Sequence, residues 1–476
     1  MSELRENAPL LDSYLSYFES ARTPFTIPGH KQRTSEIDAD LGAVVDSDIP
    51  LYGGLDEIKL TNQTLRKAES LAAKLWGADY ARFSTGGSTH ANQAIVLALG
   101  APGEKVAVSR TAHRSILSAL VLAGLEPIWM VPTIDTTTGV PIGISVEELA
   151  RALKQEPIAV LLTEPGYLGT LSDLPALIEL AHEKRIPVIV DAAWGGHFGF
   201  HHELPNHVIA LGADALITSV HKALPGYSAS ALLIAQGKHL DLDRLEQSFE
   251  TTHTTSPAGA PLASIDGVRA LLQLRGTELI GKLLDNVIHF KNIVQSEFAL
   301  PIFLYSFDFP AGRFDPTKVV LRVQQLGASG VEIEKELQSV GIRVEMADRD
   351  TIVFLATLAD RREDFDALSD VLIPILKRHQ EQRRESATAL SWSVVPERAI
   401  SMREAYFSKT VMVGAADAVG RISADLIAPY PPGVAVVAPG EVLTKTIIDG
   451  LAASKKAGVR IAYATDATLK QYRVVL

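Results

Sequence analysis

Short apolar runs alternate with amphipathic stretches through the middle of the chain. Runs of this length that end at polar residues are typical of buried strands, and seven are predicted: Tyr80–Phe83, Lys105–Ser109, Pro127–Val131, Ile158–Leu162, Pro187–Asp191, Asp214–Thr218 and Ala229–Ile234. In most of the gaps apolar residues recur at helical spacing, which predicts helices at Thr89–Leu99, Ser115–Ala123, Val146–Lys154 and Leu174–Glu183. Strands separated by helices predict an α/β fold with a mostly parallel seven-stranded sheet and helices on both faces.

The rest of the chain divides into further predicted parts. Residues 1–60 lack an extended regular pattern and are interpreted as an N-terminal arm with one short helix at Leu11–Phe18. A helix at Thr64–Trp76 opens a large domain, residues 61–300, which ends in a long helix from Ala258 to about Phe298 with an expected break at Gly276-Thr277. Residues 301–476 are predicted to form a smaller α+β domain, with strands and helices at Lys318–Val323, Thr351–Ala356, Gly330–Val340 and Arg362–Arg378.

Polar residues follow the predicted strands at the edge where ligands of such sheets bind. Lys222 comes shortly after the strand Asp214–Thr218, and Asp191 ends the strand Pro187–Asp191. A lysine amine can hold an aldehyde as a Schiff base, and a carboxylate can keep a pyridine nitrogen protonated. Together the two residues are what pyridoxal phosphate (PLP) requires.

The segment Ser84–Thr89 joins the first predicted strand to a helix and is suited to binding a phosphate. Gly86 and Gly87 let the backbone come close, and the hydroxyls of Ser88 and Thr89 act together with the helix N-terminal amides. An N-capped helix with a flexible entry is the alternative interpretation. Neither a GxGxxG fingerprint nor a Walker A loop is present, so a nucleotide enzyme is not favoured.

Histidines outside the lysine motif leave two interpretations open. His113 follows the second strand, where its imidazole would either stack on a flat cofactor ring or cap the helix that begins near Ser115. His201, His202 and His207 lie in a polar loop with no accompanying carboxylate or cysteine pattern, and we interpret them as solvated. No metal site is predicted.

Composition and charge narrow the class of protein. A chain of 476 residues is long enough for two or three domains. The net charge of −11 argues against a nucleic-acid or anionic-membrane partner, and the absence of cysteine excludes disulfides and thiolate sites. Apolar runs are broken too soon for a membrane span, and the first residues lack the pattern of a signal peptide, so a cytoplasmic location is expected.

Several motifs, in the same order and over nearly the whole chain, resemble those of one family. They are Phe25-x-x-Pro28-Gly29-His30-Lys31, Ser88-Thr89, His113-Arg114-Ser115, Asp191-x-Ala193-Trp194-Gly195-x-His197, Ser219-x-His221-Lys222, Thr254-Thr255-Ser256-Pro257 and Pro429-Tyr430-Pro431-Pro432-Gly433 followed by Pro439-Gly440-Glu441. The set is similar to the ornithine/lysine/arginine decarboxylase family of fold-type I PLP enzymes, in its shorter members without an N-terminal wing domain. Gln32, Gly86-Gly87 and Ala223–Ser228 depart from the commoner family sequences, which affects the substrate details and not the cofactor.

The resemblance implies a role for each of these residues. Lys222 would carry PLP, Asp191 would pair with its pyridine nitrogen, and His113 would stack on its ring. Further residues would contact the phosphate, the ring or the substrate: Gly87, Ser88, Thr89, Ala193, His197, Ser219 and His221. Ser256, in the segment Thr254–Ser256, would reach the site of the neighbouring subunit, so a homodimer or higher homo-oligomer with shared active sites is expected.

The expected reaction is PLP-dependent decarboxylation of a basic amino acid to its amine in polyamine metabolism. Glu441 and Trp194 are predicted to bind the substrate. The Glu441 carboxylate would accept two parallel hydrogen bonds from a guanidinium, which favours arginine over lysine and ornithine, and Glu441→Gln is expected to raise KM. A surface glutamate at the start of a helix is the alternative for Glu441.

Two other functions remain open at this point. An aminotransferase or an arginine oxidase would use the same Lys222 and Asp191. A non-catalytic regulatory relative is the alternative from another class, and the presence of both residues speaks against it.

Overall fold

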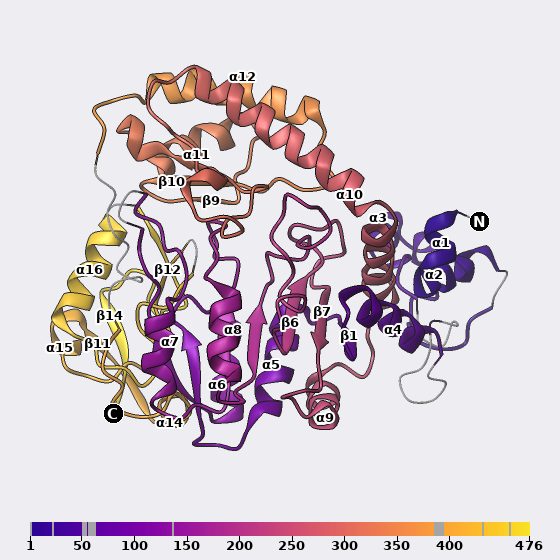
Figure 1. Ribbon diagram of the computed structural model, residues 1–476, viewed down its shortest axis with the longest axis horizontal. Helices are drawn as coiled ribbons and strands as arrows, with labels where there is room; N and C mark the ends of the chain where they lie inside the picture. Colours follow the sequence, from indigo (N-terminus) through magenta and orange to yellow (C-terminus); the bar gives the residue numbers. More distant parts are fainter. Residues whose placement is uncertain are drawn as a thin grey trace. The chain divides into compact units, whose positions relative to one another are not determined.

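The strands β1 to β7 form one seven-stranded sheet (Figure 1). The computed structural model describes residues 2–20, 23–49, 55, 63–135, 138–384, 395–430, 433–456 and 458–476. The strand order is β1-β7-β6-β5-β4-β2-β3. The strands are β1 Tyr80–Ser84, β2 Lys105–Ser109, β3 Glu126–Met130, β4 Val160–Thr163, β5 Val188–Asp191, β6 Ala215–Ser219 and β7 Ala231–Ala235. Each of the predicted strands is therefore confirmed.

The sheet is mostly parallel, as predicted, and β7 is the exception. β2 pairs in parallel with β3 and β4, whereas β7 runs antiparallel to both β1 and β6. Every residue of β5, β6 and β7 is buried. Uninterrupted apolar runs such as Ala231–Ala235 explain this burial, because they leave no polar face for solvent.

Helices occupy the predicted intervals: α4 Thr64–Trp76, α5 Gly87–Leu99, α6 Arg114–Ala123, α7 Val146–Leu153 and α8 Leu174–His182. α4 buries the apolar positions that recur at helical spacing, including Leu65, Ala68 and Ala72. It ends at Gly77, whose φ of 66° is the left-handed conformation that terminates many helices. α7 packs against β2, β3 and α8.

The chain separates into two compact units. The first comprises Met1–Ala98, Val190–His202 and Asn206–Ile280, and the second comprises Leu99–Ile189, Glu203–Pro205 and Gly281–Leu476. These units do not coincide with the boundaries expected at residues 60 and 300, and that domain division stays a prediction.

The first unit begins with short N-terminal helices, and the first two of them are hydrogen-bonded to a long helix. They are α1 Glu3–Asn7, α2 Pro9–Glu19 and α3 Ala39–Val45, and α9 spans Leu242–Thr252 in the same unit. Asp266 accepts a hydrogen bond from Leu10 N at 2.8 Å, and Arg269 donates to Asn7 O at 2.5 Å. The predicted helix at Leu11–Phe18 lies within α2.

The long helix α10, Gly259–Ser296, is continuous, so the predicted break at Gly276-Thr277 is wrong. Gly276 has a packing role instead, because a Cβ at this position would lie 3.2 Å from the Cβ of Phe200. Thr277 Oγ1 also donates to Phe200 O at 3.1 Å. A glycine inside a helix costs about 1 kcal/mol, and here it allows the close approach of Phe200.

The C-terminal part of the second unit contains a three-stranded antiparallel sheet of order β8-β10-β9. Its elements are β8 Val319–Arg322, α11 Gly330–Ser339, β9 Met346–Ala347, β10 Thr351–Phe354 and α12 Arg362–Arg378. Ile333 of α11, Leu372 of α12 and Phe290 of α10 meet in one buried core with Leu321 and Ile352. The strands and helices predicted for this region are confirmed.

The last part of the chain has two small antiparallel sheets, β11–β14 and β12–β13. Its elements are α14 Met402–Phe407, β11 Thr410–Gly414, α15 Ala415–Ala418, β12 Ala428–Tyr430, α16 Lys445–Lys456, β13 Arg460–Ala462 and β14 Gln471–Val475. Pro429 and Tyr430 of the proline-rich motif lie in β12, and Pro431 and Pro432 lie outside the described residues.

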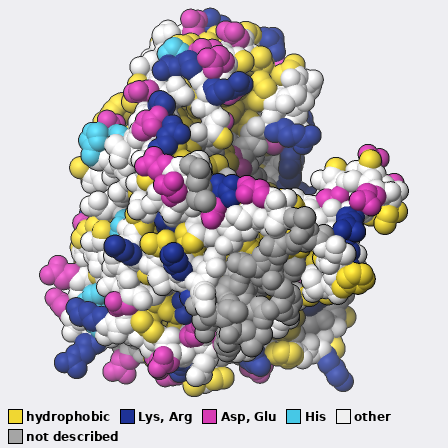
Figure 2. Space-filling model, turned by 90° about the vertical axis from the view of Figure 1, so that its right-hand side faces the viewer, with side chains coloured by type: hydrophobic (Ala, Val, Ile, Leu, Met, Phe, Trp, Pro, Cys, Tyr) yellow, Lys and Arg dark blue, Asp and Glu magenta, His cyan; other side chains and the backbone are white. Residues whose placement is uncertain are grey.

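Acidic and basic side chains are interspersed on the face of the protein shown in Figure 2. Among the described residues, no helix combines the length and the apolar character needed to cross a membrane.

Candidate active site

Lys222 lies in a loop that starts where β6 ends. The loop closes on itself, since Val220 N donates to Ser230 O at 3.0 Å and Gly226 N donates to Val220 O at 2.6 Å. The Lys222 Nζ lies 4.5 Å from the centre of the Trp194 ring, within the range of a cation–π contact. The half-buried amine is therefore held near the exit of a buried strand.

Asp191 is the last residue of β5, the strand beside β6, and only 3% of it is exposed. Asn92 Nδ2 donates to Asp191 Oδ2 at 2.8 Å, and Ala193 N donates to Oδ1 at 3.2 Å. Ala192 N donates to Ile217 O of β6 at 2.8 Å, which ties the strand end to its neighbour. Each oxygen of the buried carboxylate thus has a donor, and the two hydrogen bonds fix the orientation of the carboxylate.

The turn between β1 and α5 brings two predicted phosphate ligands together. α5 begins at Gly87, whose φ is 69°, and the Oγ atoms of Ser88 and Ser219 lie 2.8 Å apart. A Cβ on Gly86 would lie 2.7 Å from the Cβ of His90, so this position requires glycine. The hydroxyls and the first N–H groups of α5, including that of Thr89, form the kind of donor set that binds a phosphate.

Two histidines that the sequence analysis did not single out hold this turn in place. His90 Nδ1 lies 2.8 Å from Ser84 Oγ, and His90 Nε2 lies 3.2 Å from Phe249 O. His253 Nε2 lies 3.3 Å from Thr85 Oγ1. Burial lowers the pKa of His90 to about 4 and also lowers the pKa of His253, so both rings are neutral at pH 7.

The remaining candidates of the first unit differ in exposure. His221 Nδ1 lies 3.2 Å from Ser230 O, and burial lowers the pKa of the His221 imidazole, which is therefore neutral at pH 7. His197 is 1% exposed, with its ring centre 4.9 Å from that of Phe198. In contrast, Ser256 is exposed, and its N–H donates to Thr254 Oγ1 at 3.2 Å.

His113 lies in the second unit and is the N-cap of α6. Its Nδ1 accepts a hydrogen bond from Ser115 N at 3.3 Å and lies 2.9 Å from Ser115 Oγ, while the residue is exposed. The helix-capping interpretation is thus confirmed. Stacking on a cofactor ring uses the face of the imidazole and stays a prediction.

The partner of the Glu441 carboxylate differs from the one predicted from the sequence. Its carboxylate forms a bidentate ion pair with Arg110, at 2.6 and 2.8 Å, and each of the two residues is only 1–2% exposed. Ala438 N also donates to Glu441 Oε2 at 2.7 Å, and the Arg110 guanidinium lies 4.6 Å from the Trp129 ring centre. The structure therefore shows a buried ion pair where the sequence predicted a carboxylate for the substrate, and the surface-glutamate alternative is wrong too.

Replacing Glu441 with glutamine should therefore destabilise the fold and leave KM for the amino acid nearly unchanged. The change leaves the buried Arg110 without a charged partner, which costs about 3–5 kcal/mol of unfolding free energy. Chemical denaturation of both proteins measures the loss, and the double variant Arg110→Met/Glu441→Leu should recover part of it. Full stability combined with a raised KM would support the original substrate-binding prediction.

Glu164, which follows β4, gives the fold a pH dependence of its own. Burial raises the pKa of its carboxyl to about 7. Hydrogen bonds from Ser172 Oγ at 2.5 Å and Ser172 N at 3.1 Å lower this pKa, but by less than burial raises it. The folded state therefore binds a proton that the unfolded state releases near pH 4.5, and unfolding free energy falls as pH rises from about 4.5 to about 7. The loss is on the order of 3 kcal/mol.

Glu164→Gln should remove this slope, because glutamine resembles the protonated glutamate at every pH. Melting temperatures at pH 5 and pH 8 measure the slope, with the exposed Glu183→Gln as the control for loss of a carboxylate. Equal slopes in wild-type protein and Glu164→Gln would show that Glu164 does not titrate in this range.

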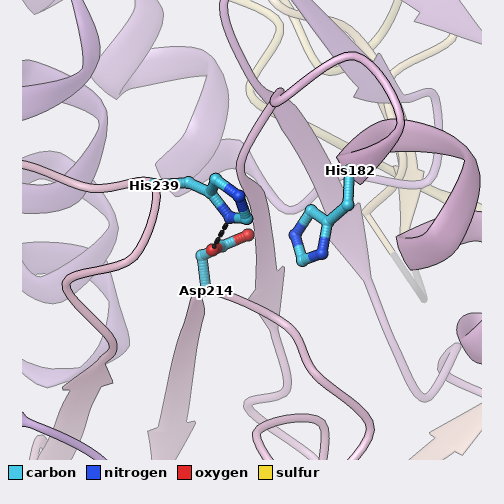
Figure 3. A group of neighbouring side chains, drawn as sticks. All are labelled: His182, Asp214 and His239. Carbon is cyan, nitrogen blue, oxygen red and sulfur yellow. Dashed lines mark hydrogen bonds and ion pairs between the residues drawn. The ribbon is translucent and has the colours of Figure 1, made fainter.

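Asp214 and His239 form a second polar pair in the first unit, at the start of β6 and not at its Lys222 end (Figure 3). His239 Nδ1 lies 2.8 Å from Asp214 Oδ1, and Gln236 N donates to Asp214 O at 2.9 Å. This pair joins the beginning of β6 to the segment after β7. His182, also labelled in Figure 3, belongs to the second unit.

The residues of the first unit fit PLP. The Lys222 amine suits its aldehyde, the doubly hydrogen-bonded Asp191 suits a protonated pyridine nitrogen, and the hydroxyls of Ser88 and Ser219 suit its phosphate. The fold and this donor set together define a PLP-dependent enzyme.

Comparison with known proteins specifies the family. The family model for the Orn/Lys/Arg decarboxylase major domain matches residues 8–308, and the model for the C-terminal domain matches residues 381–461. The chain belongs to the Orn/Lys/Arg decarboxylase family, so the resemblance stated from the sequence is confirmed, as is PLP as the cofactor.

Full-length relatives and solved structures agree with this assignment. The chain is 32% identical to the arginine decarboxylase of Bacillus subtilis (strain 168) over 488 residues, with 99% of this chain and 98% of that protein covered. It is 31% identical to the arginine decarboxylase of Halalkalibacterium halodurans, with 99% and 98% covered. The structure of lysine decarboxylase A from Pseudomonas aeruginosa shares the fold, with a TM-score of 0.82 at 17% identity and coverage of 99% and 81%.

Proposed function

We propose that this chain decarboxylates arginine in preference to lysine and ornithine and supplies the amine for polyamine biosynthesis. One observation carries the preference. The relatives named arginine decarboxylase are 30–32% identical to the chain, whereas those named lysine decarboxylase are 21–23% identical. Since Glu441 is paired with Arg110, the residue that receives the guanidinium is another one.

Different residues of the chain have different roles in the proposed reaction. When bound, PLP supplies the electron sink for the Cα–carboxylate bond. Lys222 Nζ would hold the cofactor through its aldehyde, and Asp191 would hold a proton at the pyridine nitrogen. Ser88 and Ser219 bind the phosphate and thereby fix the orientation of the ring. After CO₂ leaves, Lys222 Nζ or the His197 imidazole delivers a proton to Cα.

Neither an aminotransferase nor an arginine oxidase is favoured, because the full-length relatives at 30% identity or more are named decarboxylases. A non-catalytic relative is disfavoured by the presence of Lys222 and Asp191.

The preference is tested by supplying arginine, lysine and ornithine together at equal concentration to the PLP-loaded enzyme. Amine analysis by chromatography should show agmatine as the main product. Predominance of cadaverine or putrescine would overturn the arginine assignment without touching the family assignment.

The proposed working form is a cytoplasmic homodimer in which Thr254–Ser256 completes the active site of the partner. The exposure of this segment on the protomer supports a role outside its own chain. Mixing Lys222→Ala subunits with subunits altered at Thr255 and Ser256 should restore activity, because a hybrid dimer contains one site with both parts intact. Random pairing gives roughly a quarter of the wild-type activity.

Each variant alone, taken through the same unfolding and reassembly, serves as the control. Activity in the mixture no higher than the sum of the two parents, or an active species that is strictly monomeric, would rule out the shared site.

A further inference from the structure

Asn92 is an amide buried in the middle of α5, with none of its surface exposed. Its neighbours on the buried side of the helix include Ala91, Ala94 and Ile95. Burying an amide in such surroundings is unfavourable unless it makes hydrogen bonds. The position therefore requires an explanation from its polar contacts.

The contact of Asn92 is with the residue that faces the pyridine nitrogen. Its Nδ2 donates to Asp191 Oδ2 at 2.8 Å, and the backbone N–H of Ala193 donates to Oδ1 at 3.2 Å. Asn92 thus donates from a side chain on another element, whereas the Ala193 N–H belongs to the chain just after Asp191. A hydrogen bond to an ionised acceptor is stronger than one between neutral groups.

α5 connects this contact to the phosphate end of the site. Ser88, whose hydroxyl meets Ser219, lies four residues before Asn92, so the two side chains point from the same face, about 6 Å apart along the helix axis. One rigid helix thus carries a donor for the phosphate at its first turn and the partner of Asp191 at its second.

We propose that Asn92 is a positioning residue of the decarboxylation, which holds the Asp191 carboxylate in the orientation that faces the pyridine nitrogen. The inference rests on the role proposed for Asp191 and extends it to a residue outside every motif of the sequence analysis. Asn92 acts only through Asp191, and this property distinguishes it from an amide that merely supports the fold.

Asn92→Leu removes the donor at nearly constant volume, and Gln93→Leu, on the next position of α5, is the matched control for loss of an amide. With saturating PLP, Asn92→Leu should lower kcat on the order of 10- to 100-fold, with KM for arginine nearly unchanged. The visible circular dichroism of the bound cofactor should change in Asn92→Leu and stay as in wild type in Gln93→Leu.

A double-mutant cycle with Asp191→Ala tests whether the effect runs through Asp191. In the Asp191→Ala background, Asn92→Leu should change kcat by less than about two-fold, because its acceptor is already gone. An equal loss in both backgrounds, or no loss in the wild-type background, overturns the inference. If Asn92→Leu does not fold, Asn92→Ala enters the same cycle with the same expectation.

The single variant Asp191→Ala tests the role of Asp191 separately from the role of Asn92. A normal kcat for this single variant would overturn the role of Asp191 and the inference with it. A lowered kcat combined with additive Asn92 effects would overturn the inference alone.

Discussion

Replacing Lys222 with alanine should abolish the visible absorbance of lysine-bound PLP and nearly all turnover. We propose Lys222 as the amine that binds the cofactor aldehyde, because it lies in the loop after β6 with its Nζ 4.5 Å from the centre of the Trp194 ring. Absorbance scans of the purified proteins and CO₂ release under saturating arginine and PLP measure the two losses.

Lys238→Ala, at an exposed position after β7, is the control for a general effect of removing a lysine. It should keep both the absorbance and the activity. A Lys222→Ala protein that remains active and carries a borohydride-reducible PLP adduct on another lysine would contradict the assignment.

Replacing Asp191 with alanine should lower turnover on the order of 10²-fold or more, equal to about 3 kcal/mol of transition-state stabilisation. In the role proposed for it, Asp191 holds a proton on the pyridine nitrogen, so its loss would leave the cofactor a weaker acceptor of electrons from the breaking bond. PLP should still attach through Lys222, because the amine and the phosphate donors Ser88 and Ser219 are untouched.

Steady-state kinetics and cofactor absorbance on the same preparation separate these two effects. A nearly normal kcat with saturating PLP would make Asp191 a structural strand-end residue. A loss of cofactor attachment would instead assign Asp191 to binding and not to the chemistry.

Most secondary structure was predictable because each element is encoded by residues that are neighbours in the sequence. The bounds of α4, Thr64–Trp76, and of α12, Arg362–Arg378, agree with the predicted ones. The predicted break in α10 is wrong because the role of Gly276 depends on a residue that is distant in the sequence. Gly276 was interpreted as a helix breaker, but its role depends on Phe200, which the chain order places far away.

The candidate site was predictable only in part. Asp191 ends one buried strand and Lys222 follows another, and because a strand pattern is local, the sequence alone predicts both positions. Their roles in catalysis stay predictions. The contact between Asn92 and Asp191 joins residues 99 positions apart, and the Arg110–Glu441 pair joins residues 331 positions apart. Both pairs depend on tertiary packing that no local pattern encodes, so Asn92 was missed and Glu441 was given the wrong partner.

The central claim, PLP-dependent decarboxylation of a basic amino acid, is tested most directly by the stoichiometry of one reaction. The PLP-loaded enzyme is supplied with arginine labelled at the carboxyl carbon, and labelled CO₂, amine, keto acid and peroxide are measured together. We expect one CO₂ and one amine for each arginine consumed, with activity lost when PLP is removed and regained when it is restored. Keto acid or peroxide formed in proportion to the arginine consumed would contradict the account.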